Sequence, residues 1–195
     1  MIIKSYDGTE AMYNQLLRLR ADVWLTPEEK AKLGMDLSGL GELQDLMISS
    51  PLFICQMGYL IESGLEIPVT YALGYLMTSP KDLHAKPEVI ISEQCHALDH
   101  LFKRNGQPQN VFCYNGAGTH PDHRNKGYAT QVIQAREVQL FANVEKYNIG
   151  HAFLYTWEGS VPRESKKDME MLEGIDLADP KKIIGIRNLL WPRGK

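Results

Sequence analysis

The chain has 195 residues, 44% of them apolar and 23% charged, which is the composition of an ordinary globular protein with a sizeable core. A formal net charge of −3 argues against nucleic acid as the main partner, because duplex-binding proteins carry a strong basic excess. No apolar run approaches the roughly 20 residues of a membrane helix, and the first residues lack the pattern of a secretory signal, so we expect a cytoplasmic protein with no membrane partner.

The predicted elements begin with a short strand, MIIKSY, which two helices follow. Apolar residues at helical spacing predict the first helix over 8–24, with Thr9 as its N-cap. The second helix is predicted over 26–36, where Thr26 and Glu29 have the spacing of a capping box. Both helix starts therefore rest on local sequence signals.

A hairpin and a third helix are predicted next. The apolar runs 51–61 and 68–78 are strand candidates, and the turn-rich residues between them favour a hairpin. The following segment, 92–106, is predicted to be a helix that stops at Gly106.

The remaining elements alternate between strand and helix. They are a strand over 110–119, a long helix over 128–147, a strand over 149–157, a weakly amphipathic helix over 162–174 and a final strand over 181–191. A strand–helix–strand order implies a parallel crossover, whereas the hairpin is antiparallel. We therefore predict one domain over residues 1–195, of the α/β class and the α+β type, whose sheet is antiparallel in its first half.

The stretch HPDHRNKGYAT, residues 120–130, joins a predicted strand to the longest helix. A metal site is one interpretation, because His120 and His123 are possible ligands. Pro121 separates them, however, and no Cys or Glu stands at a supporting spacing, whereas zinc needs three or four ligands. We therefore expect no metal here. The three cysteines of the chain are odd in number and widely spaced, and we expect reduced thiols.

A phosphate-binding turn is the stronger interpretation of this stretch. The long helix begins near Gly127, and a helix N-terminus offers unpaired N–H groups and a partial positive charge. Because Gly127 has no Cβ, a phosphate could approach its backbone closely. Arg124 and Lys126 add positive charge to the same turn.

The residues RNKGYA at 124–129 fit the pattern Arg-x-x-Gly-x-Gly/Ala, and the chain thereby resembles the GCN5-related N-acetyltransferase (GNAT) superfamily. In that family the pattern is the pyrophosphate loop for acetyl-CoA. The order of elements up to about residue 157 is also similar to the family's. The resemblance implies a GNAT-like mixed, mostly antiparallel sheet with a splayed parallel strand pair, flanked by helices. It also implies acetyl-CoA as the acyl donor and no metal.

The resemblance further implies which residues hold acetyl-CoA. Backbone N–H groups of the turn would bind the pyrophosphate, and the end of the preceding strand would pair with the pantetheine arm. The implied residues are Ala117, Gly118, Thr119, Arg124, Asn125, Lys126, Gly127, Tyr128, Ala129 and Thr130.

The implied reaction is direct attack of a primary amine on the thioester. An alkylamine is nearly all protonated at pH 7, so some group must take its proton, often a carboxylate acting through water. The family often uses a tyrosine before a Gly-Phe pair to protonate the departing thiolate, and no tyrosine follows Tyr155 in this chain. The candidates for acid and base are Glu158, Tyr155, Tyr114 and His151, with Glu158 first as a proton relay.

Two alternatives share the implied fold. One is a CoA-binding sensor or regulatory module without turnover, and the other is an acyltransferase with a longer acyl donor, as in acyl-homoserine-lactone synthases.

No motif identifies the acceptor, so a small molecule, an amino acid and a peptide amine all stay open. The charged residues of the first two helices are predicted to be solvated rather than to contact substrate; they are Arg18, Arg20, Asp22, Glu28 and Glu29. The final predicted strand has an apolar run that could pair across a homodimer.

Overall fold

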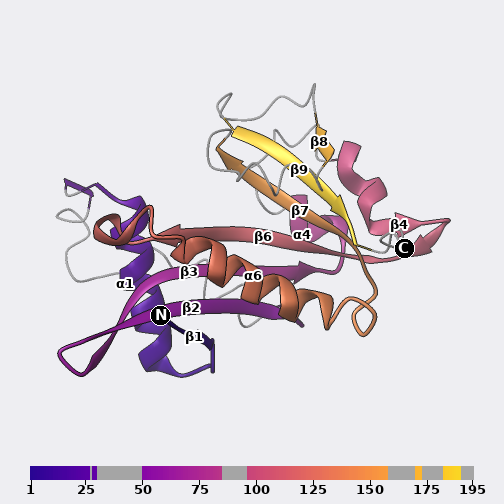
Figure 1. Ribbon diagram of the computed structural model, residues 1–195. Coiled ribbons are helices and arrows are strands. Elements are labelled where there is room, and N and C mark those ends of the chain that lie inside the picture. Colours follow the sequence, from indigo (N-terminus) through magenta and orange to yellow (C-terminus); the bar gives the residue numbers. More distant parts are fainter. Residues whose placement is uncertain (27, 30–49, 85–95, 158–169, 173–181, 190–195) are drawn as a thin grey trace. The chain divides into compact units, whose positions relative to one another are not determined.

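The computed structural model describes residues 1–26, 28–29, 50–84, 96–157, 170–172 and 182–189 (Figure 1). The chain divides into two compact units, each made of two separate stretches of sequence. Unit 1 comprises Met1–Gly74 and Gly116–Leu140, and unit 2 comprises Tyr75–Asn115 and Phe141–Lys195. Strands β3 (Leu65–Met77) and β6 (Asn110–Thr119) contribute residues to both. The single domain expected from the length stays a prediction.

Unit 1 contains the strand order β1-β2-β3-β6, in which β1 is Ile2–Ser5 and β2 is Phe53–Glu62. Strand β1 pairs antiparallel with β2. Ser63 and Gly64, both with positive φ, make the two-residue turn into β3, which confirms the predicted hairpin.

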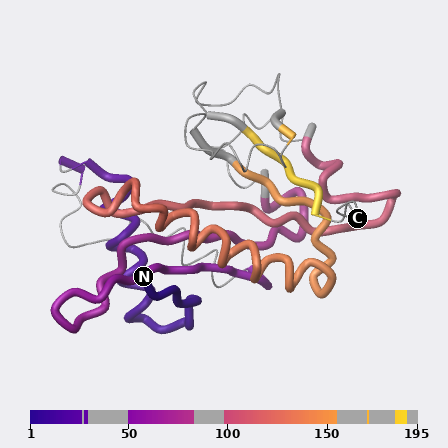
Figure 2. Tube along the Cα trace, viewed as in Figure 1, coloured from indigo at the N-terminus to yellow at the C-terminus, as the bar shows by residue number. Residues whose placement is uncertain are grey.

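The helices of unit 1 cover opposite faces of these strands (Figure 1). Helix α1 (Glu10–Trp24) packs its apolar stripe on alternate residues of β2 and β3, Cys55 and Tyr71 among them. Helix α6 (Tyr128–Phe141) lies on the other face, where Gln139 accepts a hydrogen bond of 2.6 Å from Gln56. The stretch from 116 to 140 thus returns beside the N-terminal strands, as the trace in Figure 2 shows.

The local start signals of the first two predicted helices are confirmed. The Thr9 side chain caps α1 by accepting from the backbone N–H of Met12. Thr26 and Glu29 form the two reciprocal bonds of a capping box, at 2.8 and 3.2 Å. The rest of the second predicted helix, from residue 30 on, lies outside the described residues.

Unit 2 contains the strand order β6-β7-β9-β8. Strand β7 (Ile149–Trp157) pairs in parallel with β6, from Asn110↔Ile149 to Tyr114↔Leu154. Beyond that last pair both strands continue, β6 to Thr119 and β7 to Trp157. The other pairs of the unit, β7 with β9 and β8 with β9, are antiparallel. The predicted mixed, mostly antiparallel sheet with one parallel pair, flanked by helices, is thereby confirmed.

The helix predicted over 92–106 is partly wrong. The chain forms a 3-10 helix, η2, over His96–Phe102, and then a small hairpin of β4 (Lys103–Arg104) and β5 (Gln107–Pro108). Asn105 and Gly106 both have positive φ, which is the geometry of a two-residue hairpin turn. Gly106 therefore closes a hairpin rather than a helix.

Two further elements differ from the sequence-based prediction. Helix α6 ends at Phe141, and the predicted helical residues 142–147 form turns. Inside the helix predicted over 162–174, Glu170–Leu172 is a strand, β8, because it pairs with β9 (Lys182–Asn188). The residues of β8 pair with residues elsewhere in the sequence. The weak amphipathic pattern of 162–174 gives no indication of that pairing.

The same pairing bears on the predicted homodimer. Strand β9 has β7 on one edge, and β8 occupies its other edge over Ile184–Ile186. The prediction that this strand is free to pair across a dimer is therefore wrong over those residues. A short helix, α4 (Pro80–His84), completes the helices described in this unit. In the part of the chain that the structure describes, no helix is long and apolar enough to cross a membrane.

Candidate functional site

The turn between β6 and α6 lies wholly in unit 1 and has the backbone of an anion site. Asn125 and Gly127 adopt positive φ values of 62° and 75°, and α6 begins at the next residue, Tyr128. Helix geometry leaves the N–H groups of Tyr128, Ala129 and Thr130 without intrahelical acceptors. Alternating left-handed residues and a helix start together form a concave set of N–H donors that suits a phosphate.

The surface over Gly127 is open. Apart from its neighbours in the chain, no heavy atom of the described residues lies within 4 Å of the position that a Cβ would take there, so the glycine is explained by its backbone conformation and not by crowding. An open, positively polarised backbone fits the close approach of a pyrophosphate, which is the role that the resemblance implies for this residue.

Arg124 is tied to the protein by two backbone carbonyls. Its Nε donates to Thr119 O at 3.3 Å, and its Nη2 donates to Val23 O, in the last turn of α1, at 3.4 Å. A cation is favourable at a helix C-terminus, where carbonyls are unpaired. Arg124 thus links the turn to both β6 and α1. This structural role differs from the contact with phosphate that its charge led us to expect. Lys126 donates to Asp122 O at 3.4 Å.

His120 contacts its own surroundings, and its ring lies 5.8 Å from that of His123 between centroids. His120 precedes a short 3-10 segment, η3 (Pro121–His123), and its Nδ1 accepts from the Asp122 N–H at 3.4 Å. Its Nε2 lies 4.0 Å from a carboxylate oxygen of Asp22 in α1. The described residues contain no group of three or more His, Cys, Asp or Glu side chains that could hold a metal ion. The absence of metal in the protein itself stays a prediction.

The end of β6 packs tightly against α1 and β3. A Cβ at Gly118 would lie 2.5 Å from Val23 Cγ1 and 3.4 Å from Tyr71 Cε1, so only a glycine fits this contact. Thr70 Oγ1 donates to Gly118 O at 2.9 Å and lies 3.0 Å from Thr119 Oγ1. Contacts with α1 and β3 therefore fix the position of the segment that is expected to pair with the pantetheine arm.

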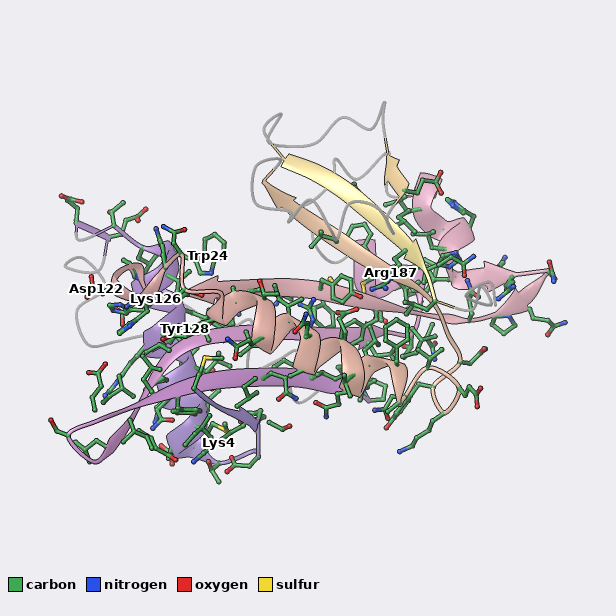
Figure 3. The ribbon with its side chains drawn as sticks, viewed as in Figure 1. Lys4, Trp24, Asp122, Lys126, Tyr128 and Arg187 are labelled. Carbon is green, nitrogen blue, oxygen red and sulfur yellow. The ribbon has the colours of Figure 1, made fainter. Side chains whose placement is uncertain are left out.

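A pair of aromatic residues beside this segment was missed by the sequence analysis. The Trp24 Nε1 donates to the Tyr71 phenol, and half of the Trp24 surface is exposed. Figure 3 labels the Trp24 side chain. The Tyr71 side chain is fully buried, and burial raises its pKa. Trp24 ends a helix and Tyr71 lies far along the chain, so the sequence does not indicate that the two side chains meet.

The prediction that Arg20 is solvated is also wrong. Its Nε and Nη1 are buried, whereas Arg18, two positions earlier on α1, is exposed as predicted. The helical pattern places Arg20 one turn before Trp24, on the face toward β3.

The acid–base candidates belong to unit 2 or lie outside the description. His151 Nδ1 lies 2.7 Å from Gln109 Nε2 and 3.2 Å from Leu101 O, and burial lowers its pKa. Tyr114 is buried and makes an edge contact with Phe112. The backbone of Tyr155 pairs with β9, and Glu158 lies outside the described residues.

Free cysteines in the described residues are buried, as expected of reduced thiols. These are Cys55 and Cys113, while Cys95 lies outside the description. Burial raises the pKa of Cys55 to about 12, so this thiol stays protonated at neutral pH.

Comparisons with known proteins rest on structure alone. No protein-family model matches the sequence, and no curated protein does. Among solved structures, NAA60 from Arabidopsis thaliana in complex with acetyl-CoA superposes with a TM-score of 0.60 at 9% identity, over 96% of this chain and 98% of that one.

Two further solved structures give similar scores. Aminoglycoside 6'-acetyltransferase type Ii has a TM-score of 0.54 at 16% identity, with 100% of both chains covered. PaiA N-acetyltransferase from Thermoplasma acidophilum, in complex with coenzyme A, has a TM-score of 0.51 at 9% identity, over 96% of this chain and 99% of that one. The chain therefore has the fold of the GCN5-related N-acetyltransferases.

Proposed function

We propose that the protein is an N-acetyltransferase that binds acetyl-CoA at the turn before α6 and transfers the acetyl group to a primary amine by direct attack. The observation that carries this proposal is the open left-handed turn at Asn125 and Gly127, followed at once by the N-terminus of α6. The geometry of the turn supports the binding of an anion, and the pattern RNKGYA resembles the loop with which the family binds a pyrophosphate.

The names of the structural neighbours support the same reaction. Two of them are named as acetyltransferases, and two were solved with acetyl-CoA or coenzyme A. The other molecules in the names of the neighbours differ: one neighbour is an aminoglycoside acetyltransferase, and a further one, the NatC complex, with a TM-score of 0.54 at 10% identity, was solved with a Gag peptide and CoA. The fold therefore supports the donor more than it supports any one acceptor.

In this proposal the chain's own groups do three things. The N–H groups of Asn125 to Thr130 bind the pyrophosphate, and the strand end at Ala117 to Thr119 aligns the pantetheine arm. A carboxylate, a phenol or an imidazole then takes the amine proton through water, with Glu158 as first candidate and Tyr155, Tyr114 and His151 after it. The cytoplasmic location expected from the sequence is part of the same proposal.

The turn is tested by replacing Gly127 with glutamate and measuring CoA affinity by calorimetry. The new side chain places a carboxylate against the pyrophosphate, and we expect affinity to fall on the order of a hundredfold. Gly64→Glu is the matched control, because Gly64 has a similar φ of 81° and equally open surroundings in the same unit. Equal affinities in the two variants would contradict the assignment of the turn.

Turnover separates the enzyme from its alternatives. Thiol release from acetyl-CoA in the presence of an amine panel is expected for the transferase, and none is expected for a sensor module that binds CoA only. Comparison of acetyl-CoA with a longer acyl-CoA distinguishes the acyl-homoserine-lactone-synthase-like alternative, which requires faster release from the longer donor.

A further inference from the structure

Strand β1 is the outermost strand of unit 1, because among the described strands it has a neighbour on one side only (Figure 1). It pairs antiparallel with β2 in a regular register over Ile2–Ser5, without a bulge. All of its residues are exposed, and the three successive apolar residues Met1, Ile2 and Ile3 are 36–39% exposed. A regular edge strand with exposed apolar side chains is a template for pairing with another strand.

The directions of the backbone groups of β1 follow from one hydrogen bond at its end. The Tyr6 N–H donates to Cys55 O at 2.9 Å, so the backbone of Tyr6 faces β2. Because successive residues of a strand direct their backbone groups to alternate sides, those of Lys4 also face β2, whereas those of Ile3 and Ser5 face away from it. The N–H and C=O groups of Ile3 and Ser5 are here called the open edge of β1.

Side-chain contacts fix β1 on the sheet and draw its lysine away from the open edge. Lysines protect many natural edge strands against pairing. Lys4 (Figure 3) instead reaches across β2, where its Nζ lies 2.5 Å from Glu66 Oε2 in β3 and 5.4 Å from the centre of the Tyr59 ring. On the other face of the strand, Gln56 Nε2 donates to Ser5 Oγ at 2.9 Å. The open edge is therefore preformed, and the Lys4 charge is already paired within unit 1.

We propose that the open edge of β1 pairs with β1 of a second copy of this chain, antiparallel and about a two-fold axis at Ile3. A strand that pairs antiparallel with its own copy is self-complementary, since each copy offers the donors and acceptors that the other lacks. In this register the Ile3 N–H of each copy donates to Ile3 O of the other, and the Ser5 N–H donates to Met1 O. The inference is independent of the proposed acetyl transfer.

Charge and side-chain contacts favour the second copy in this register. Ile3 pairs on β2 with Gly58, which has no side chain, so a directly opposite side chain for Ile3 can come only from the open edge. A two-fold axis at Ile3 supplies the Ile3 side chain of the second copy and sets Lys4 opposite Ile2. An axis one residue later, at Lys4, would set two like charges opposite each other, which is destabilising.

The test is sedimentation velocity of the parent protein over roughly 5–500 µM, where the dimer fraction should grow with concentration. Ile3→Lys sets two cations opposite each other at the axis, and the dissociation constant of the dimer should rise on the order of a hundredfold. Leu65→Lys is the matched control. Leu65 is an exposed apolar residue at the start of β3, two strands away from the open edge, so its replacement should leave the dissociation constant within about twofold of the parent's.

A cysteine at position 3 tests the same contact without adding charge. Ile3→Cys should form an intermolecular disulfide under mild oxidation, because the Cα atoms of a hydrogen-bonded antiparallel pair lie about 5.5 Å apart, within the range that a disulfide spans. Ile2→Cys is the control, since Ile2 is similarly exposed, at 39%, but is set opposite Lys4 of the second copy and not opposite itself. Both variants contain the same native cysteines, so a difference between them depends on the new thiol alone.

Each other outcome overturns the inference. A parent protein that sediments as a monomer at every concentration would leave this edge to a partner of another sequence. Equal dissociation constants in Ile3→Lys and Leu65→Lys would place the contact between copies elsewhere. Equal cross-linking of Ile2→Cys and Ile3→Cys would exclude the axis at Ile3, and this comparison decides the matter if Ile3→Lys does not fold.

Discussion

Asn125 and Gly127 in the turn before α6 share a left-handed backbone, and Arg124 beside them serves a separate purpose. Asparagine is one of the few residues with a side chain that tolerates this conformation, and glycine adopts it freely. This conformation suits backbone N–H groups that converge on an anion, whereas the Arg124 guanidinium donates to the carbonyls of Thr119 and Val23. The pattern RNKGYA thus combines residues that we propose to bind the pyrophosphate with an arginine that fixes the position of the turn.

This division predicts different effects for two substitutions of Arg124. Arg124→Gln removes the charge and keeps N–H donors, so we expect CoA affinity within about threefold of the parent. Arg124→Ala removes both hydrogen bonds, each worth about 0.5–1.5 kcal/mol, and should weaken CoA binding on the order of tenfold. Calorimetry at low and high salt is the measurement. Equal losses in both variants, together with a weaker salt dependence, would mean that the charge acts on the phosphates directly.

Sequence signals predicted those elements whose causes are local. Thr9 and the pair Thr26 and Glu29 cap their helices as their spacing indicated, because a cap is formed within a few residues. The strand at Glu170–Leu172 was missed, since its hydrogen bonds come from β9. The Asn105–Gly106 turn was a local signal that a helical interpretation overrode.

The candidate site divides in the same way. The turn at 124–130 could be found from its pattern, whereas the pair of Trp24 and Tyr71 could not, because these two residues meet only after α1 packs on β3. Arg20 was interpreted as a solvated charge for that reason. The sequence of an amphipathic helix does not indicate whether the guanidinium of an arginine lies in solvent or is buried.

The contacts of His151 in β7 with Gln109 and with Leu101 in η2 lead us to predict a pH effect on stability. Gln109 Nε2 donates to Leu101 O at 2.7 Å and lies 2.7 Å from His151 Nδ1, so the imidazole is fixed at a half-buried place. Burial sets the His151 pKa below the ordinary value of 6.5. Between the two pKa values, the unfolded chain therefore binds a proton at His151 that the folded chain does not bind. The free energy of unfolding should fall as the pH drops from about 6.5 through the folded pKa.

Urea unfolding at pH 7 and pH 5 measures this effect. The fall in midpoint between the two pH values should be smaller in His151→Gln than in the parent, because the variant has no imidazole to protonate. Parallel falls in the two proteins would assign the acid sensitivity to other groups. The same variant also tests His151 as an acid–base candidate. Loss of turnover at pH 7 with unchanged CoA affinity is expected only if His151 takes part in catalysis.

At the scale of the molecule, the two compact units are interleaved along the chain. Unit 1 needs residues 116–140, and unit 2 needs 75–115, so neither unit is a single stretch that could be cut out. Strands β3 and β6 run through both units, and unpairing either strand removes hydrogen bonds from each. We therefore expect one cooperative unfolding transition in calorimetry, with equal calorimetric and van't Hoff enthalpies.

Coenzyme A should move that transition as a whole, although its expected contacts at the turn lie in unit 1. A ligand that binds only the folded state at a hundred times its Kd adds about 2.7 kcal/mol, and for a chain of this size that raises Tm by roughly 5–10 °C. Differential scanning calorimetry with and without CoA is the measurement, and Gly127→Glu should lose the shift while Gly64→Glu keeps it. Two resolved transitions, of which CoA moves one, would contradict the coupling, because they would show that the strands shared by both units do not transmit the stabilisation.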